Sequence, residues 1–140
     1  PMSPLYETSA RAVGGREGHV ETADGLFKAD LAMPKALGGS GNGANPEQLF
    51  AAGYAACFES AVRHVARQQK LGLKDAAVTA TVQLFPKDGG GFRLGVALAA
   101  EIEGLEEAAA RELVETAHQV CPYSNAVRGN IDVQLTTTVR

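Results

Sequence analysis

Residues 45–58 form the stretch that decides the fold, and they read NPEQLFAAGYAACF. Asn45 is a suitable helix N-cap, Pro46 suits the first helical position, and Gln48 completes the spacing of a capping box. After Gln48 the stretch contains no charged residue, so the start of the predicted helix is apolar on every side and should be buried on several faces. Charged residues return beyond the stretch, and Gly72 marks the expected end of the helix.

Short segments with strand-like alternation lie on both sides of this helix. Glycine-containing turns separate three such segments before it, and a hairpin, a second helix and a last strand follow it. The expected strands cover 5–13, 16–23, 26–33, 77–85, 92–102 and 131–139, and the expected second helix covers 106–120. This order predicts the α+β class, with mostly antiparallel hairpins and two main helices. A length of 140 residues suits a single domain that covers residues 1–140.

Composition and charge exclude several classes of function. The net charge is −3, so nothing draws the surface toward nucleic acid or toward an anionic membrane. No run of apolar residues is long enough for a membrane span, and the N-terminus lacks the basic-then-apolar pattern of a secretory signal. We therefore expect a cytoplasmic protein that binds neither nucleic acid nor membranes.

Two cysteines, Cys57 and Cys121, are the main candidates for chemistry. A permanent structural disulfide is rare in a reducing cytoplasm, so two thiols that matter would be catalytic, redox-sensing or metal-binding. Both could also be inert, buried core residues, which is a common place for free cysteine. Cys121 precedes Pro122, and a residue before proline is disfavoured in the helical region. Cys121 is therefore expected at a break between two helical pieces.

Charged residues near the cysteines leave further alternatives open. Arg16 lies in a glycine-flanked turn, where it could be presented inward or could be a solvated turn charge. Glu47 could orient Arg16 through a two-pronged ion pair, or could simply be an acid at a helix start. His64 is seven residues after Cys57, about 10 Å along a helix axis, which is too far for a base that activates the thiol directly.

The chain offers little for a metal or a bound cofactor. Its three histidines do not pair at metal-ligand spacing. The glycines at 38–43 lack the Lys-Ser/Thr that follows a phosphate-binding loop, and no serine lies in a nucleophile elbow. We expect no metal site and no bound cofactor.

Three segments together resemble the organic hydroperoxide resistance proteins, a branch of the larger OsmC-type family. They are residues 45–58, residues 120–130 (VCPYSNAVRGN), and the turn at 14–18 (GGREG) with the Asp-Gly pair that follows it. These matches span nearly the whole chain, and two of them are built round a cysteine. Family members often carry Thr before the Asn-Pro-Glu-Gln run, where this chain has Ala44.

The resemblance implies a role for four residues. Cys57 matches the peroxidatic cysteine and Cys121 the resolving cysteine, while Arg16 matches the arginine that stabilises the thiolate and Glu47 its carboxylate partner. It also implies a thiol-dependent peroxidase that reduces alkyl or fatty-acid hydroperoxides to alcohols through a Cys57 sulfenic acid and a Cys57–Cys121 disulfide. The electrons would come from the lipoyl group of a partner protein. The implied fold is an intertwined homodimer with antiparallel β-sheets wrapped around two buried central helices.

The physical chemistry of the residues agrees with these roles. An arginine lowers a thiol pKa and stabilises negative charge on peroxide oxygens, and the apolar residues around Cys57 suit an apolar peroxide. Glu47 and Cys57 are ten residues apart, roughly 15 Å along one helix. Two antiparallel copies of the helix would bring Glu47 of one copy level with Cys57 of the other.

Other functions stay open from the sequence. One is a peroxidase of the OsmC branch with a different peroxide preference. Another is a non-enzymatic redox sensor or carrier of an apolar ligand, in which the thiols signal but do not turn over. The third is a protein with two inert core thiols.

Overall fold

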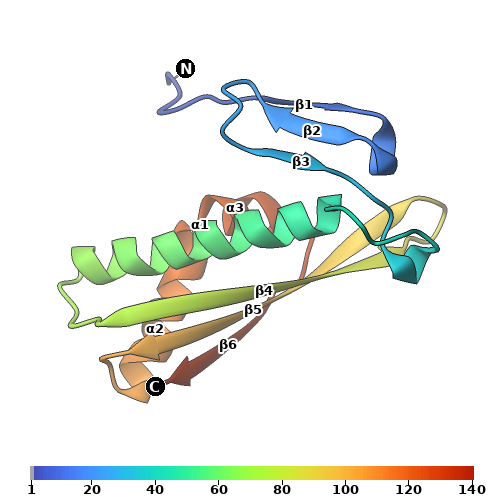
Figure 1. The fold of residues 1–140 in the computed structure, drawn as a ribbon. Helices are drawn as coiled ribbons and strands as arrows, with labels where there is room; N and C mark the ends of the chain where they lie inside the picture. Colours follow the sequence, from blue (N-terminus) through green and yellow to red (C-terminus); the bar gives the residue numbers. More distant parts are fainter. Residues whose placement is uncertain (1) are drawn as a thin grey trace. The chain divides into compact units, whose positions relative to one another are not determined.

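The computed structural model describes residues 2–140. The chain divides into two compact units, one that ends at Leu49 and one that runs from Phe50 to Arg140 (Figure 1). Helix α1 (Pro46–Gln68) begins in the first unit and continues through the second. The structure is of the α+β class, with two three-stranded sheets.

The first unit is a small antiparallel sheet in the order β1-β2-β3. Its strands are β1 (Ala10–Val13), β2 (His19–Thr22) and β3 (Lys28–Asp30). All three are shorter than the sequence predicts. The segment expected at 16–23 starts as a strand only at His19, because Gly15–Glu17 form a 3-10 turn in which Gly14 and Gly15 adopt positive φ. This turn holds Arg16 between β1 and β2.

This first unit buries very little of itself. Every residue of β1 is exposed, and the described residues of the unit include only two buried ones, Ala32 and Asn45. A three-stranded sheet is stable on its own only when one face is covered. The unit therefore depends on surfaces beyond its own strands.

The second unit contains a larger sheet in the order β4-β5-β6. Strands β4 (Asp75–Pro86) and β5 (Phe92–Glu103) form a long antiparallel hairpin, while β6 (Gln134–Val139) pairs with β5 in parallel. The other strand pairs are antiparallel, as the predicted hairpins require, but the antiparallel sheet that the resemblance implies is wrong for β6. A parallel neighbour requires a crossover connection, usually helical, and helices α2 (Glu107–Val120) and α3 (Pro122–Val127) supply it.

Helix α1 starts where the sequence predicts and ends slightly earlier. The Oδ1 atom of Asn45 accepts a hydrogen bond of 2.9 Å from the backbone N–H of Gln48, as an N-cap does. At the other end Lys70 has φ +55, and the N–H of Leu71 bonds to the carbonyl of Ala66 at 2.9 Å. These are the features of a Schellman motif. The helix therefore ends at a left-handed Lys70, two residues before Gly72, where the sequence predicts its end.

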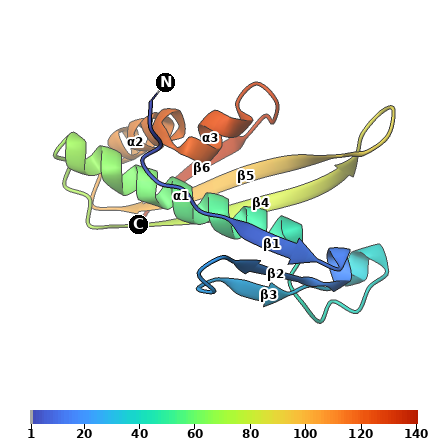
Figure 2. The ribbon, with the colours of Figure 1, turned by 90° about the horizontal axis from the view of Figure 1, so that it is seen from above.

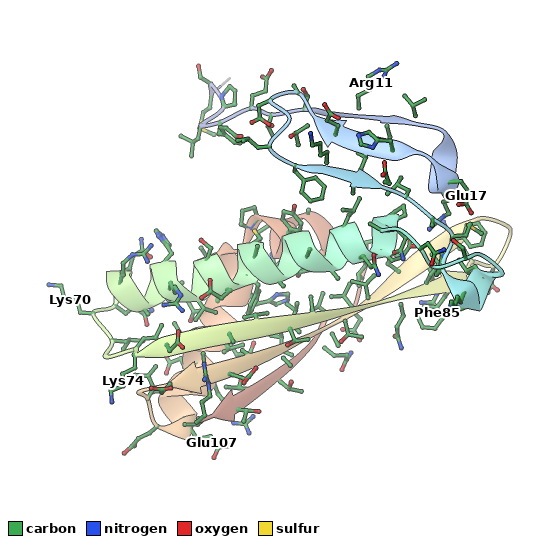
Figure 3. All side chains as sticks on the ribbon, viewed as in Figure 1. Arg11, Glu17, Lys70, Lys74, Phe85 and Glu107 are labelled. Carbon is green, nitrogen blue, oxygen red and sulfur yellow. The ribbon has the colours of Figure 1, made fainter. Side chains whose placement is uncertain are left out.

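Both main helices lie over one face of the larger sheet (Figure 2). Alternate residues of β5 point to that face and are buried, from Val96 through Leu98 and Ala100 to Ile102, which is the two-residue period of a strand with one covered side. Lys70 and Lys74 point away from this core (Figure 3).

None of the helices formed by residues 2–140 combines the length and the apolar character needed to cross a membrane.

Candidate active site

The two cysteines lie next to each other in the second unit. Cys57 is half-buried in the middle of α1, and Cys121 is fully buried between α2 and α3. Their Sγ atoms are 3.5 Å apart, with the Cys121 thiol donating to Cys57. Both are free thiols. A disulfide bond is about 2.05 Å long, so the sulfurs would need to approach by roughly another 1.5 Å to bond.

The local sequence explains why Cys121 lies at this point. Its N–H bonds to the carbonyl of Ala117 at 2.8 Å and closes α2, while its carbonyl accepts from the N–H of Asn125 at 2.9 Å and opens α3. Its ψ of 123° is outside the helical region, as expected for a residue before proline. The predicted break between two helical pieces at Cys121 is confirmed.

The surroundings of Cys57 within the second unit disfavour its thiolate. Burial is the largest influence and raises the pKa of the Cys57 thiol, because a charged sulfur loses hydration. A hydrogen bond from the backbone N–H of Tyr123 lowers the pKa of Cys57 and opposes this rise. The neighbouring Cys121 thiol raises the pKa further. A reactive thiolate at Cys57 therefore needs a further favourable charge.

The expected partner of such a thiolate, Arg16, forms an ion pair in the first unit. Its two terminal nitrogens donate to both carboxylate oxygens of Glu47, at 2.7 and 3.0 Å. This two-pronged geometry is the strong form of an arginine–carboxylate pair. The hydrogen bonds from Arg16 hold the pKa of Glu47 below its usual value, although partial burial opposes them. The sequence alternative in which Arg16 pairs with Glu47 is thus the arrangement present in the structure.

Aromatic side chains surround the dithiol on the α1 side. The Tyr123 ring lies 5.7 Å from that of Tyr54 and 6.5 Å from that of Phe50, measured between ring centroids. Gly53 makes this packing possible, because a Cβ there would lie 2.8 Å from the Tyr123 hydroxyl. Gly53 is one helical turn before Cys57, so the Tyr123 ring packs on α1 one turn away from the thiol.

A chain of hydrogen bonds beside the dithiol joins three helices. The hydroxyl of Tyr54 on α1 and the Oγ atom of Ser124 on α3 are 2.7 Å apart. The same Oγ atom is 2.8 Å from Nδ1 of His118 on α2. Tyr54 and Ser124 are fully buried. Burial and, to a smaller extent, the charge of Arg128 lower the pKa of His118, and the Nδ1 atom of a neutral ring can accept a hydrogen bond from the Ser124 hydroxyl.

Sequence reasoning did not find this chain. Tyr54 is one of the apolar residues around Cys57 in the sequence, and His118 is one of the three histidines that lack metal-ligand spacing. The one available signal is spacing, since His118 and Ser124 stand three residues before and three residues after Cys121. Of the other histidines, His64 is exposed, and His19 contacts Asp30 at 2.8 Å. Residues 2–140 contain no group of three or more His, Cys, Asp or Glu side chains placed to hold a metal ion.

Comparisons with known proteins agree with this geometry. A family model described as "OsmC-like protein" matches residues 39–136. The organic hydroperoxide resistance protein of Xanthomonas axonopodis pv. citri is 49% identical over 97% of this chain and 96% of its own length. For the organic hydroperoxide resistance protein OhrB of Bacillus subtilis, the identity is 46% over 94% of this chain and 96% of that relative.

Solved structures extend the likeness to the fold. A crystal structure of an organic hydroperoxide resistance protein from Legionella pneumophila superposes with a TM-score of 0.96 at 61% identity, and the match covers 98% of this chain and all of that one (100%). The structure of OhrB from Bacillus subtilis has a TM-score of 0.86 at 44% identity, covering 96% and 100%. The chain therefore belongs to the OsmC-like protein family, among its organic hydroperoxide resistance proteins.

Proposed function

We propose that this protein is a thiol-dependent peroxidase that reduces organic hydroperoxides, alkyl or fatty-acid, to alcohols. Cys57 is the nucleophile and Cys121 is the resolving cysteine. The observation that carries the proposal is the 3.5 Å distance between the two sulfurs, in a pair where one thiol is half-buried and the other fully buried. Two inert core thiols would not need to lie side by side at the point where α2 ends and α3 begins.

The first step consumes the peroxide. The Cys57 thiolate attacks the terminal oxygen of the hydroperoxide, the O–O bond breaks, and the alkoxide leaves and takes up a proton to become the alcohol. Cys57 is left as a sulfenic acid. Arg16, held by Glu47, lowers the thiol pKa and stabilises negative charge on the peroxide oxygens. Arg16 would thus supply the favourable charge that Cys57 does not receive from the second unit itself.

The second step closes the disulfide. The sulfur of Cys121 attacks the sulfur of the Cys57 sulfenic acid, the S–O bond breaks, and the leaving hydroxide combines with the Cys121 proton to form water. The short distance between the sulfurs favours this step over further oxidation of Cys57 by a second peroxide.

The cycle requires two electrons from outside the protein. A dithiol attacks the Cys57–Cys121 disulfide and leaves as its own cyclic disulfide, and both cysteines return to thiols. We propose that the dithiol is the lipoyl group of a partner protein and that the peroxidase itself binds no cofactor. A reducing cytoplasm would keep the thiols free between turnovers.

The side chains near Cys57 favour a peroxide with an apolar tail. Phe50, Tyr54 and Tyr123 pack edge to face or tilted against one another, and Phe50 also lines a hollow of about 610 Å³ in the second unit. The apolar part of that lining consists of Phe50, Phe92, Leu94, Val127 and Ile131, and its charged and polar part consists of Lys87, Arg93, Asn130 and Asp132. Apolar surfaces of this kind bind hydrocarbon and offer little to hydrogen peroxide.

The exposed apolar surface favours an intertwined homodimer. In a single chain, Leu26 is 88% and Phe92 is 73% exposed, and Ala52 and Ala56 are exposed on the uncharged part of α1. Small side chains let two helices approach closely, and a two-fold axis would pair this surface with itself. We propose that two copies of α1 pack at the centre of the dimer, with the sheets wrapped around them.

The function is tested by peroxide consumption under multiple turnover. With dihydrolipoamide as the reductant, we expect the protein to consume cumene hydroperoxide continuously and to prefer it to hydrogen peroxide in specificity constant. Equal or reversed preference would indicate the OsmC-branch alternative. Oxidation that stops after one equivalent, with the dithiol present, would contradict the enzyme and indicate a redox sensor.

A further inference from the structure

The hydrogen-bonded chain Tyr54–Ser124–His118 has a position that the proposed catalytic cycle leaves unexplained. Each of its three members belongs to a different helix, and the Ser124 hydroxyl is the shared link. Ser124 is fully buried, and among residues 2–140 no buried side-chain nitrogen or oxygen lacks a hydrogen-bond partner. A single hydroxyl can donate to one neighbour and accept from the other, so the chain is fully satisfied.

The hydrogen bonds of Tyr54, Ser124 and His118 join the same three helices that hold the two thiols. Tyr54 is three residues before Cys57 on α1, which puts both on one side of that helix. Cys121 is the residue at which α2 ends and α3 begins, and Ser124 and His118 lie on either side of it. The Ser124 hydroxyl therefore links the helix that carries Cys57 to the joint that carries Cys121.

We propose that Ser124 is a positioning residue for disulfide closure, and that it acts by tying α3 to Tyr54 and His118 so that the Cys121 thiol stays within reach of Cys57. The proposal rests on the proposed peroxidase function and deepens it. Ser124 itself does not touch the peroxide or exchange electrons.

The small size of α3 explains why it needs the hydrogen bonds of Ser124 to stay in place. The helix has six residues, so few backbone hydrogen bonds hold it in place. The sulfurs must move roughly 1.5 Å closer from their 3.5 Å separation to reach bonding distance. Fixing two reacting groups near this geometry raises their effective concentration. Loss of the tie would let α3 and the Cys121 thiol spread over a wider range of positions.

A positioning role predicts that two chemical steps respond differently. Sulfenic acid formation uses only Cys57 and the peroxide, so it should be nearly insensitive to Ser124. Closure uses Cys121 and should be slowed. A general loss of packing would instead slow both steps together and lower the stability of the protein in proportion.

The test is single-turnover kinetics on the full-length protein. Reduced wild type and Ser124→Ala are mixed with one equivalent of cumene hydroperoxide, and sulfenic acid and disulfide are followed separately by rapid quench and mass spectrometry. We expect closure in Ser124→Ala to be slower by about tenfold or more, with sulfenic acid formation within about twofold of wild type and more sulfinic acid in excess peroxide. Thr116→Ala is the matched control, because its hydroxyl bonds only to the carbonyl of Glu112 on α2, and closure should stay at the wild-type rate.

Two further variants keep the test decisive if Ser124→Ala does not fold. Tyr54→Phe and His118→Asn each change one end of the chain, and each should slow closure more than sulfenic acid formation. If Ser124→Ala folds, combining it with Tyr54→Phe should add little further slowing, because both remove the same link.

Several results would overturn the proposal. Closure at the wild-type rate in Ser124→Ala, or in both Tyr54→Phe and His118→Asn, would do so. An equal slowing of both steps would do so as well. Failure of the proposed function has a different signature, since wild type itself would then form neither sulfenic acid at Cys57 nor a disulfide.

Discussion

The two units of this chain differ in what they bury and in what chemistry they carry. The unit from Phe50 to Arg140 has a packed core of two helices on one face of a sheet, and it contains both thiols. The unit that ends at Leu49 has three short strands, only two buried residues among those described, and the Arg16–Glu47 ion pair. The thiols are thus held by a core within one unit, while the charged pair joins the turn between β1 and β2 to the first turn of α1 in a unit with little buried surface.

The two parts of the proposed mechanism, activation of the Cys57 thiol and disulfide closure, therefore have different structural requirements. Disulfide closure depends on groups within one well-packed unit, where distances are fixed by the core. In the proposed mechanism, activation of the Cys57 thiol depends instead on the charge of Arg16, which belongs to the other unit. Variants in the two units should therefore fail in different ways.

The largest effect is expected at Cys57. Cys57→Ser replaces the nucleophile by a hydroxyl of far lower reactivity, so peroxide turnover should be abolished while the fold stays intact. Steady-state peroxide consumption and circular dichroism measure the two properties. Retention of most of the activity would rule out Cys57 as the nucleophile.

Cys121→Ser should stop the cycle at a later point. The variant should react once with peroxide, because Cys57 is unchanged, and then stall as a sulfenic acid that over-oxidises in excess peroxide. Mass spectrometry of the oxidised variant would detect the sulfinic and sulfonic products. Normal cycling with a dithiol reductant would show that Cys121 has no resolving role.

A smaller effect is expected in the first unit. Arg16→Ala should raise the pKa of the Cys57 thiol above its wild-type value. It should also slow the peroxide step by more than tenfold, which corresponds to roughly 1.4 kcal/mol of barrier. The measurement is thiolate absorbance against pH together with single-turnover kinetics. Glu47→Gln is the control: it keeps Arg16 but removes its charged partner, and should change the same quantities less. A thiol titration unchanged in Arg16→Ala would contradict the role.

The smallest effect is expected when the protein is diluted, which tests the proposed homodimer. Because the first unit lacks a core of its own, light scattering at micromolar concentration should report a dimer. On further dilution the first unit should lose its strand structure before the second does, as hydrogen exchange would show. A monomer at micromolar concentration with both units protected would contradict the homodimer.

The sequence predicted local structure better than it predicted topology. The Asn45 N-cap, the break at Cys121 and the α+β class are present in the structure, because each depends on a few neighbouring residues or on their alternation. The parallel pairing of β6 was missed, since strand direction depends on how α2 and α3 cross the sheet. The helix end was misplaced by a few residues because Lys70 adopts a conformation that glycine usually takes.

The candidate site shows the same division. The Arg16–Glu47 pair was among the alternatives that the residues allowed, and the roles of both residues stay predictions. The resemblance pairs Cys57 with Cys121, but their 3.5 Å approach could not be derived from the residues themselves, because 64 residues separate them along the chain. The Tyr54–Ser124–His118 chain was missed for the same reason, since it exists only where three helices meet.

The most direct test of the account is the identity of the bond that peroxide creates. Reduced wild type is treated with one equivalent of cumene hydroperoxide, trapped with an alkylating reagent, digested without reductant and mapped by mass spectrometry. We predict a disulfide between Cys57 and Cys121 of the same chain, with both cysteines protected from alkylation. Recovery of both cysteines as alkylated thiols, or of a disulfide that joins two chains, would contradict it.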